Sequence, residues 1–357
     1  MKVPELNIDK IQRVAVRIPN WVGDAVMSLP ALHALRELLP EAHITVVSRP
    51  GSADIFMDAD FIDDVLIYDR SGLGLAWKQV REWKRRRFDL AVLLQNAFEA
   101  AAIAFLARVP LRIGYDTDRR GFLLTHAVPS PAWKDERHEI FYYLNIIREL
   151  GRPFDKEVDV KIPQFALTVS EERKQHAKKL LKQHGIRRDD PFVLLCPGSV
   201  NSRAKRWPAD RYADLADRFT ESGARVVLIG TQAELNVSQE VCARARHQPT
   251  LLTGVTTVGE VTALISVADV LVTNDTGPAH IGSAVGTPTL VIFGPTNPAT
   301  TRPFGPSGEI IRLPPDCAPC MLRDCPIDHR CMTAISVAEV FERARVLMSA
   351  SRAEVGA

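Results

Sequence analysis

The sequence has no long uninterrupted hydrophobic run. The nearest candidate, residues 97–111, is interrupted by Glu99, Arg108 and Pro110, whereas a membrane-spanning helix needs about 20 consecutive, mostly apolar residues. The first residues, MKVPELNIDK, are polar and include a proline, so we expect no signal peptide. These two absences predict a cytoplasmic protein without a transmembrane segment.

An excess of charge of one sign is also lacking. The chain has 45 basic and 43 acidic residues and a formal net charge of +2, so it has no overall positive field that would attract nucleic acid. We therefore expect no nucleic-acid partner, and any basic surface must be local. With 46% hydrophobic and 25% charged residues among 357, the composition is typical of a soluble protein with about two domains.

Glycine-rich phosphate-binding motifs are missing as well. No Walker motif and no GxGxxG sequence follows an expected strand, which argues against a P-loop nucleotide hydrolase and weakens the case for a dehydrogenase. Cysteine is scarce, with six residues in the chain. In a cytoplasmic protein these are more often thiols or metal ligands than disulfides.

Both halves of the chain repeat a strand-then-helix rhythm. Nearly continuous apolar runs, typical of parallel strands covered on both faces, alternate with helical patterns. Strands are expected at residues 13–18, 43–48, 64–69, 89–95, 192–198, 225–230, at the end of 261–274, and at 287–294. Helices are expected at 24–39, 75–87, 208–223, 233–245 and 277–286, with Pro30 kinking or delaying the first of them.

This rhythm predicts an α/β protein with two doubly wound Rossmann-like domains. The mixed, proline-bearing residues 151–190 are expected to link them. Ligands of such sheets bind outside the carboxyl ends of the strands, so the loops that follow the expected strands are the places to look for chemistry.

The loop after residues 261–274 carries the strongest signal. Asp275, Thr276 and Gly277 lead into a helix, whose free N–H groups and positive dipole end form an anion site. His280 lies one turn further on. A carboxylate would repel a diphosphate, so Asp275 is expected to accept hydrogen bonds from sugar hydroxyls or loop N–H groups. The alternative is an ordinary helix capped by Thr276.

Two further loops of the second half offer polar groups. Ser199 and Lys205 follow residues 192–198, and a lysine there can neutralise charge on a departing phosphate; the alternative is a solvated basic loop. Glu234 follows residues 225–230 and can bind a ribose hydroxyl or can simply be an acid in the first turn of a helix.

Residues 23–32, 197–208 and 273–296, in this order and spacing, resemble the bacterial lipopolysaccharide heptosyltransferases of glycosyltransferase family 9. The resemblance covers nearly the whole chain, and the form NWVGD followed by VMS is more similar to type II than to type I. It implies a GT-B fold, in which two Rossmann-like domains face each other across a cleft. The acceptor-side domain with the catalytic base would comprise residues 1–165, and the donor domain residues 166–357.

The resemblance implies an inverting transfer of L-glycero-D-manno-heptose. The donor would be ADP-heptose and the acceptor the first heptose of the inner core on Kdo-lipid A, with no cofactor needed for catalysis. The acceptor would lie at the inner membrane surface, so a cytoplasmic enzyme that can associate peripherally with the cytoplasmic face is expected. Alternatives are heptosyltransferase I, a transferase using another nucleotide sugar, a nucleotide-sugar epimerase, and a nucleotide-binding protein without activity.

The family's functional residues can be matched to positions of this chain. Asp24 matches the catalytic base, which would remove the proton of the acceptor hydroxyl, an effect typically worth about 10²–10⁴-fold; otherwise it merely caps a helix. Lys205 matches the lysine at the donor phosphates. The other matched donor residues are Asp275, Thr276, Gly277 and His280. Ser199 and Glu234 are matched across the loop before Lys205, which varies in length.

Side chains that could meet the acceptor lie in the first half. Trp21 lies three residues before the proposed base. Arg119 and Arg120 are candidates for acceptor phosphates, whereas Arg85, Arg86 and Arg87 are better explained as a solvated helix end.

Four cysteines gather near the carboxyl-terminal end, beginning with a CxxC pair. Their spacing suggests a structural zinc clip, with His329 as a possible substitute ligand, or else free thiols in a loop. The four residues are Cys317, Cys320, Cys325 and Cys331.

Overall fold

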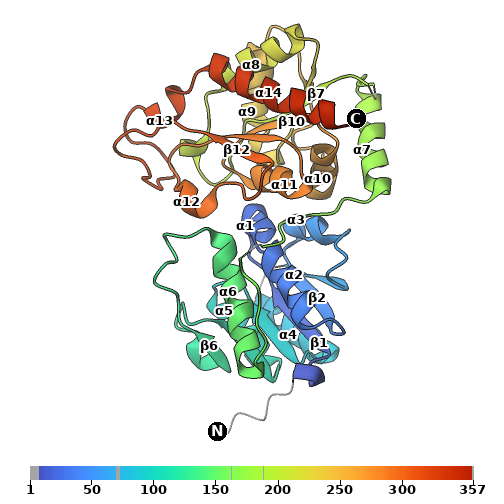
Figure 1. The fold of residues 1–357 in the computed structure, drawn as a ribbon, viewed down its shortest axis with the longest axis vertical. Helices are drawn as coiled ribbons and strands as arrows, with labels where there is room; N and C mark the ends of the chain where they lie inside the picture. The colour runs from blue at the N-terminus through green and yellow to red at the C-terminus, as the bar shows by residue number, and fades with distance from the viewer. Residues whose placement is uncertain (1–7, 70–72, 162, 188, 356–357) are drawn as a thin grey trace. The chain divides into compact units, whose positions relative to one another are not determined.

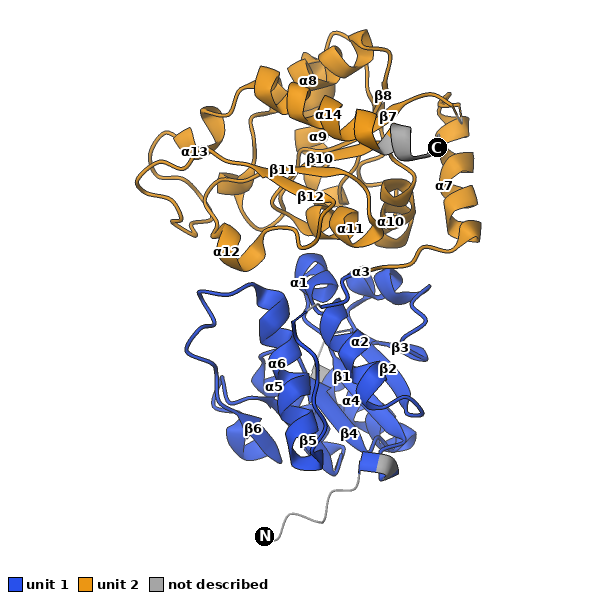
Figure 2. Ribbon diagram, viewed as in Figure 1, with its two compact units in different colours: residues 1–165 blue, residues 166–357 orange. Residues whose placement is uncertain are grey.

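The computed structural model describes residues 8–69, 73–161, 163–187 and 189–355. Its contacts divide the chain into two compact units, residues 1–165 and 166–357 (Figure 2). Each unit contains one six-stranded sheet. The acceptor and donor roles expected for the two parts of the chain stay predictions.

Unit 1, coloured blue to green in Figure 1, is built around an all-parallel sheet in the order β3-β2-β1-β4-β5-β6, whose strands are labelled in Figure 2. Its strands are β1 (Arg13–Arg17), β2 (His43–Ser48), β3 (Asp64–Ile67), β4 (Leu90–Leu93), β5 (Leu111–Tyr115) and β6 (His126–Val128). Its α-helices are α1 (Val22–Met27), α2 (Leu29–Leu38), α3 (Pro50–Ala53), α4 (Leu73–Arg86), α5 (Phe98–Leu106) and α6 (Glu139–Gly151), with 3-10 turns η1 (Ile8–Lys10), η2 (Asp54–Phe56), η3 (Gly121–Leu123) and η4 (Arg152–Phe154).

Alternating side chains of these strands bury both faces of the sheet. Ala15, Val47 and Leu93 form one core with α4 and α5, while α2 packs against α6 in a second layer. The strand order reverses between β1 and β4, which is the point where doubly wound sheets bind their ligands.

The first predicted helix differs from the expectation. Residues 24–39 were expected to form one helix kinked or delayed by Pro30, but the chain forms α1 and α2, which meet at Ser28. Pro30 lies in the first turn of α2, where its missing N–H costs no helical hydrogen bond. The break makes α1 a short helix that starts directly after Trp21.

Unit 2 repeats the same plan, with its parallel sheet in the order β12-β11-β10-β7-β8-β9. Its strands are β7 (Phe192–Cys196), β8 (Arg225–Leu228), β9 (Thr250–Leu251), β10 (Val270–Asn274), β11 (Thr289–Ile292) and β12 (Gly308–Ile311). Its helices are α7 (Glu171–Gln183), α8 (Ala209–Glu221), α9 (Leu235–Arg244), α10 (Val258–Ser266), α11 (Gly277–Val285), α12 (Pro298–Thr301), α13 (Arg330–Thr333) and α14 (Val337–Val355), with turns η5 (Arg203–Lys205) and η6 (Gln232–Glu234). Its order reverses between β7 and β10.

The segment expected to link the two halves contains more structure than predicted. Residues 163–169 belong to no helix or strand, but α7 follows, capped by a hydrogen bond from the Arg173 N–H to the Ser170 hydroxyl. Among the described residues, no helix has both the length and the apolar character needed to cross a membrane.

Candidate functional site

The carboxyl end of β1 leads directly to the residue matched to a catalytic base. Asp24 occupies the first turn of α1 and is partly buried, and Trp21 before the helix is 56% exposed. The loop between β1 and α1 is braced by Arg17, whose guanidinium donates to the Asn20 side chain at 2.5 Å and lies over the Tyr68 ring. These contacts hold the loop that precedes Asp24 in place.

A second carboxylate, for which no sequence motif predicts a role, lies near Asp24. Glu139 is the first residue of α6, a helix that packs against α1. Burial, followed by the charge of Asp24, raises the pKa of Glu139 to about 7. The buried Tyr143 shares a hydrogen bond with Glu139, and burial together with Asp24 raises the pKa of Tyr143 as well. Asp24 thus belongs to a coupled acidic cluster in unit 1.

The two arginines predicted to bind acceptor phosphates have different environments. Arg119 is exposed. Arg120 is fully buried, with its guanidinium bonded to the Tyr115 carbonyl at 2.9 Å, the Asn96 side chain at 2.9 Å and the Gln95 carbonyl. The structure therefore corrects the expectation for Arg120, whose donors hold the loops after β4 and β5 together.

The arginine triplet also has local partners. Arg85 and Arg86 both form ion pairs with Glu82, and Arg86 also pairs with Asp64. The hydrogen bonds from Arg85 and Arg86 lower the pKa of Glu82 to about 2. These ion pairs are consistent with the expected solvated end of α4.

Lys205 and Asp275, expected separately in the donor loops, form an ion pair at the carboxyl edge of the second sheet. The Lys205 Nζ donates to Asp275 Oδ2 at 2.9 Å and to the Asp275 carbonyl at 3.1 Å. Thr296, which the sequence reading did not single out, donates its hydroxyl to the same carboxylate oxygen at 2.6 Å. Asp275 is 3% exposed, so its carboxylate orients the lysine.

Asn274 joins the ends of the two central strands of unit 2. Its side-chain amide donates to the carbonyls of Pro197 and Gly198 and accepts from the Trp207 N–H and the Tyr212 hydroxyl, at 2.9–3.1 Å. The sequence analysis placed this fully buried residue at the end of an expected strand and assigned it no role. It fixes the β7 loop, which carries Lys205, relative to the β10 loop, which carries Asp275.

Ser199 belongs to the loop after β7, and Glu234 packs against that loop. The carboxylate of Glu234 accepts from the N–H and hydroxyl of Thr231 at 2.8 and 2.9 Å, forming a capping box. A Cβ at Gly198 would lie 2.3 Å from Glu234 Oε1, so this close approach requires glycine. Ser199 is buried, and its carbonyl accepts from Arg206.

The start of α11 has the backbone expected for an anion site. Thr276 precedes the helix but its side chain makes no capping hydrogen bond; instead its hydroxyl donates to the Asn274 carbonyl at 3.3 Å. Gly277 is the first helical residue, and His280 is buried on the first turn. The capping alternative for Thr276 is therefore wrong.

The cysteine-rich segment packs on the turn that carries Lys205. His329 Nε2 lies 2.6 Å from the Ala204 carbonyl, and the Ala204 N–H donates to the Arg323 carbonyl at 2.9 Å. Burial, followed by the neighbouring thiols, raises the pKa of Cys331 to about 11. Within the part of the chain that the structure describes, no three His, Cys, Asp or Glu residues are arranged to hold a metal; the zinc clip stays a prediction.

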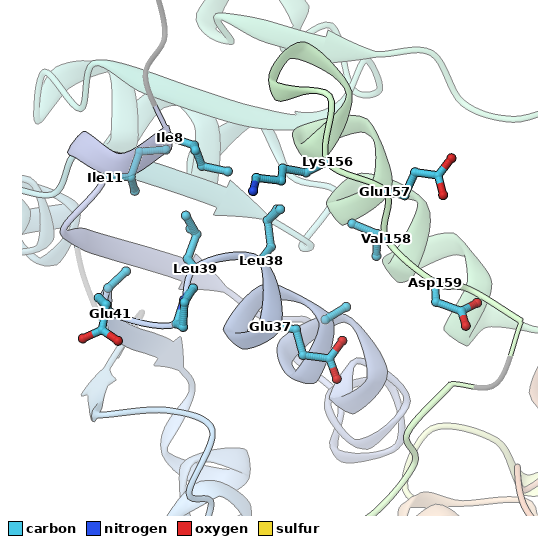
Figure 3. A pocket seen from close by; sticks show the side chains of 13 residues that line it. Ile8, Ile11, Glu37, Leu38, Leu39, Glu41, Lys156, Glu157, Val158 and Asp159 are labelled. Atoms are coloured by element: carbon cyan, nitrogen blue, oxygen red, sulfur yellow. The ribbon is translucent and has the colours of Figure 1, made fainter.

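Figure 3 shows a pocket of unit 1 elsewhere, lined by η1, the end of α2 and residues 156–159. Its ionisable lining residues are Glu37, Glu41, Lys156, Glu157 and Asp159. None of the residues predicted for the functional site lines it, so it is not the place of the predicted chemistry.

Comparisons with known proteins agree with this arrangement. The model of the family "Glycosyltransferase family 9 (heptosyltransferase)" matches residues 76–330. The chain is 28% identical to the Escherichia coli lipopolysaccharide heptosyltransferase 2, over 84% of this chain and 88% of that one. It is 30% identical to the Haemophilus influenzae lipooligosaccharide heptosyltransferase 2, over 83% and 87%.

Solved structures confirm the predicted fold of two doubly wound α/β domains. The structure of E. coli ADP-heptose LPS heptosyltransferase II matches with a TM-score of 0.82 and 24% identity, covering 96% of this chain and all of that one. A family 9 glycosyltransferase from Veillonella parvula matches with a TM-score of 0.84 and 24% identity, covering 96% and 98%.

The raised pKa of Glu139 predicts a pH-dependent contribution to stability. A carboxyl whose pKa is higher in the folded protein favours folding at low pH, and this contribution is lost as the pH rises from its ordinary value of 4.5 to about 7. We expect the Glu139→Gln variant to gain stability relative to the native chain across this window. Urea unfolding at the two ends of the window measures the difference. The exposed Glu136→Gln is the control, and a Glu139→Gln difference that does not change with pH would contradict the expectation.

Proposed function

Since the chain belongs to glycosyltransferase family 9, the heptosyltransferases, we propose that this glycosyltransferase moves L-glycero-D-manno-heptose from ADP-heptose to the first heptose of the lipopolysaccharide inner core, with inversion. The observation that carries the proposal is the similarity, over most of the chain, to relatives named heptosyltransferase 2. In this proposal unit 1 binds the acceptor and unit 2 the donor.

Asp24 acts as the general base in the proposed reaction. When the acceptor hydroxyl attacks the anomeric carbon of the heptose, its proton passes to the Asp24 carboxylate. The bond between that carbon and the phosphate oxygen breaks, and ADP leaves with the electron pair. Attack and departure on opposite faces of the sugar invert the configuration. Support comes from the place of Asp24, which follows the central strand β1 at the carboxyl edge of its sheet.

Lys205 stabilises the departing ADP. Two of its three ammonium donors are directed at Asp275, which leaves the third for a phosphate oxygen. The start of α11, whose first N–H groups receive no cap from Thr276, contributes further donors and the positive dipole end. Ser199, Glu234, Gly277 and His280 complete the proposed donor site, in which Asp275 positions the lysine and does not itself meet the phosphate.

The proposed acceptor site uses the exposed residues of unit 1. Trp21 can stack on a sugar face, since its ring is more than half exposed beside the proposed base. Arg119 is the remaining candidate for an acceptor phosphate. The acceptor is a lipid-linked saccharide, so we place the enzyme in the cytoplasm and at the cytoplasmic face of the inner membrane.

The reaction is expected to need no divalent metal, because Lys205 and the start of α11 already balance the charge of the leaving diphosphate. Adding EDTA should leave the initial rate of ADP release unchanged. A rate that collapses and returns with magnesium would contradict this account of the phosphate site. A native mass with one bound zinc would support the predicted zinc clip at the four cysteines.

Asp24→Asn tests the proposed base. The substitution nearly preserves shape but removes the proton acceptor, so turnover should fall by about 10²-fold or more. The affinity for ADP, measured by calorimetry, should not change, because the donor site lies in unit 2. Asp60→Asn, an exposed aspartate of the same unit, is the matched control. Near-normal turnover of Asp24→Asn would leave Asp24 with a structural role only.

A further inference from the structure

The outer surface of α4, α5 and η3 in unit 1 exposes large aromatic side chains. Trp77 of α4 is 59% exposed and Phe122 of η3 is 76% exposed, while Phe98 and Phe105 of α5 are each nearly half exposed. Single exposed apolar residues are ordinary on protein surfaces, but a group of them marks a binding surface.

The elements that carry these aromatic residues adjoin one another. Helix α4 packs against α5, and α5 packs against η3. The rings of Phe98 and Phe122 are in contact, with centroids 6.2 Å apart. All three elements cover the same core, which includes Trp83, Ile103 and Leu123.

Basic side chains accompany the aromatic ones. Helix α4 has five basic residues and a single acid, Glu82, and that acid is already paired with Arg85 and Arg86. Arg81 and Lys84 are exposed on the same helix, one and two turns after Trp77. We call Trp77, Arg81, Lys84, Phe98, Phe105 and Phe122 together the aromatic–basic face.

The topology places much of this face at the edge of the sheet that also carries Asp24. Phe98 begins α5 just after β4, and Phe122 follows β5. Trp77 lies near the start of α4, which begins after β3. Because all the strands are parallel, their carboxyl ends, and the elements that start there, share one edge with Asp24.

We propose that the aromatic–basic face docks unit 1 onto an anionic lipid bilayer. Aromatic side chains settle at the depth of the lipid headgroups, and lysine and arginine are attracted to the negative surface of the cytoplasmic leaflet. Their combination on one helical surface is typical of interfacial binding. A second copy of this chain is a poorer occupant, since two copies of the same basic face would repel each other when paired symmetrically.

This inference deepens the proposed function, on which it rests for the lipid-linked acceptor. A membrane held against the aromatic–basic face would keep the acceptor's saccharide at the edge of the sheet where Asp24 stands. Docking on the bilayer would then increase the encounter rate with the acceptor without changing the chemistry at the site.

Co-sedimentation of the full chain with vesicles tests the proposal. Vesicles of phosphatidylcholine and phosphatidylglycerol should bind the protein, binding should weaken with salt, and phosphatidylcholine alone should bind it at least about tenfold less. The double variant Arg81→Glu/Lys84→Glu should weaken vesicle binding by a similar factor. The double variant Trp77→Ser/Phe122→Ser should weaken vesicle binding at low salt and at high salt.

Matched controls separate the face from general effects of charge and hydrophobicity. Lys179→Glu/Lys182→Glu makes the same charge change on the exposed side of α7, and Met57→Ser/Val255→Ser removes equally exposed apolar groups; both should bind vesicles normally. Equal binding by the face and control variants, or no binding by the native chain, would overturn the proposal. A dimer that is detected by sedimentation velocity and that the variant Arg81→Glu/Lys84→Glu dissociates would also overturn the proposal.

The failure of the docking surface can be distinguished from the failure of the proposed function. The face variants should transfer heptose normally to a detergent-solubilised acceptor, and should be impaired only with acceptor embedded in vesicles. Vesicle binding without any transfer by the native chain would retain the surface and reject the reaction. Transfer that the face variants carry out equally well on both acceptors would retain the reaction and reject the surface.

Discussion

The buried amide of Asn274 is the contact on which the proposed donor site of unit 2 depends. It links the ends of β7 and β10, at the point where the strand order reverses, through hydrogen bonds to Pro197, Gly198, Trp207 and Tyr212. A buried amide that lost these partners would leave several polar groups unsatisfied. Once the two loops are joined, Asp275 lies beside Lys205, and the start of α11 lies beside both.

The proposed acceptor site of unit 1 depends on a different kind of constraint, since its central carboxylate belongs to an acidic cluster. Asp24, Glu139 and Tyr143 come from α1 and α6, which pack together, and their charges influence one another. Burial and the charge of Asp24 raise the pKa of Glu139 to about 7, which favours its protonated form relative to an ordinary carboxyl. The cluster can therefore hold a proton near the proposed base without a full second negative charge.

The sequence predicted the fold more completely than the site. Apolar runs report burial on two faces, so the parallel strands could be recognised locally. Lys205 and Asp275 were each predicted, but their ion pair depends on the pairing of β7 with β10, which brings together residues distant in the chain. Glu139 could not be recognised, because its raised pKa arises only when α6 packs against α1.

The environments of individual side chains also could not be predicted from the sequence. Arg119 and Arg120 are chemically identical in the sequence, yet Asp118 and Arg119 adopt left-handed backbone conformations, and the chain then turns the side chain of Arg120 into the core. The cysteine spacing likewise suggested a metal clip, but it did not predict that the His329 side chain and the Arg323 carbonyl of that segment support the turn that carries Lys205. Spacing alone did not predict which of these side chains would be used structurally.

The central claim is heptose transfer to an acceptor that already carries one heptose. The most direct test incubates the chain with ADP-heptose and either heptosylated or bare Kdo-lipid A, and determines kcat/KM for each acceptor from the mass of the products. The account predicts a gain of one heptose and a preference for the heptosylated acceptor of roughly 10- to 200-fold or more, since a bare acceptor leaves part of the binding surface unfilled. Equal or reversed preference would contradict the assignment of the acceptor, and the absence of any heptose transfer would contradict the proposed reaction.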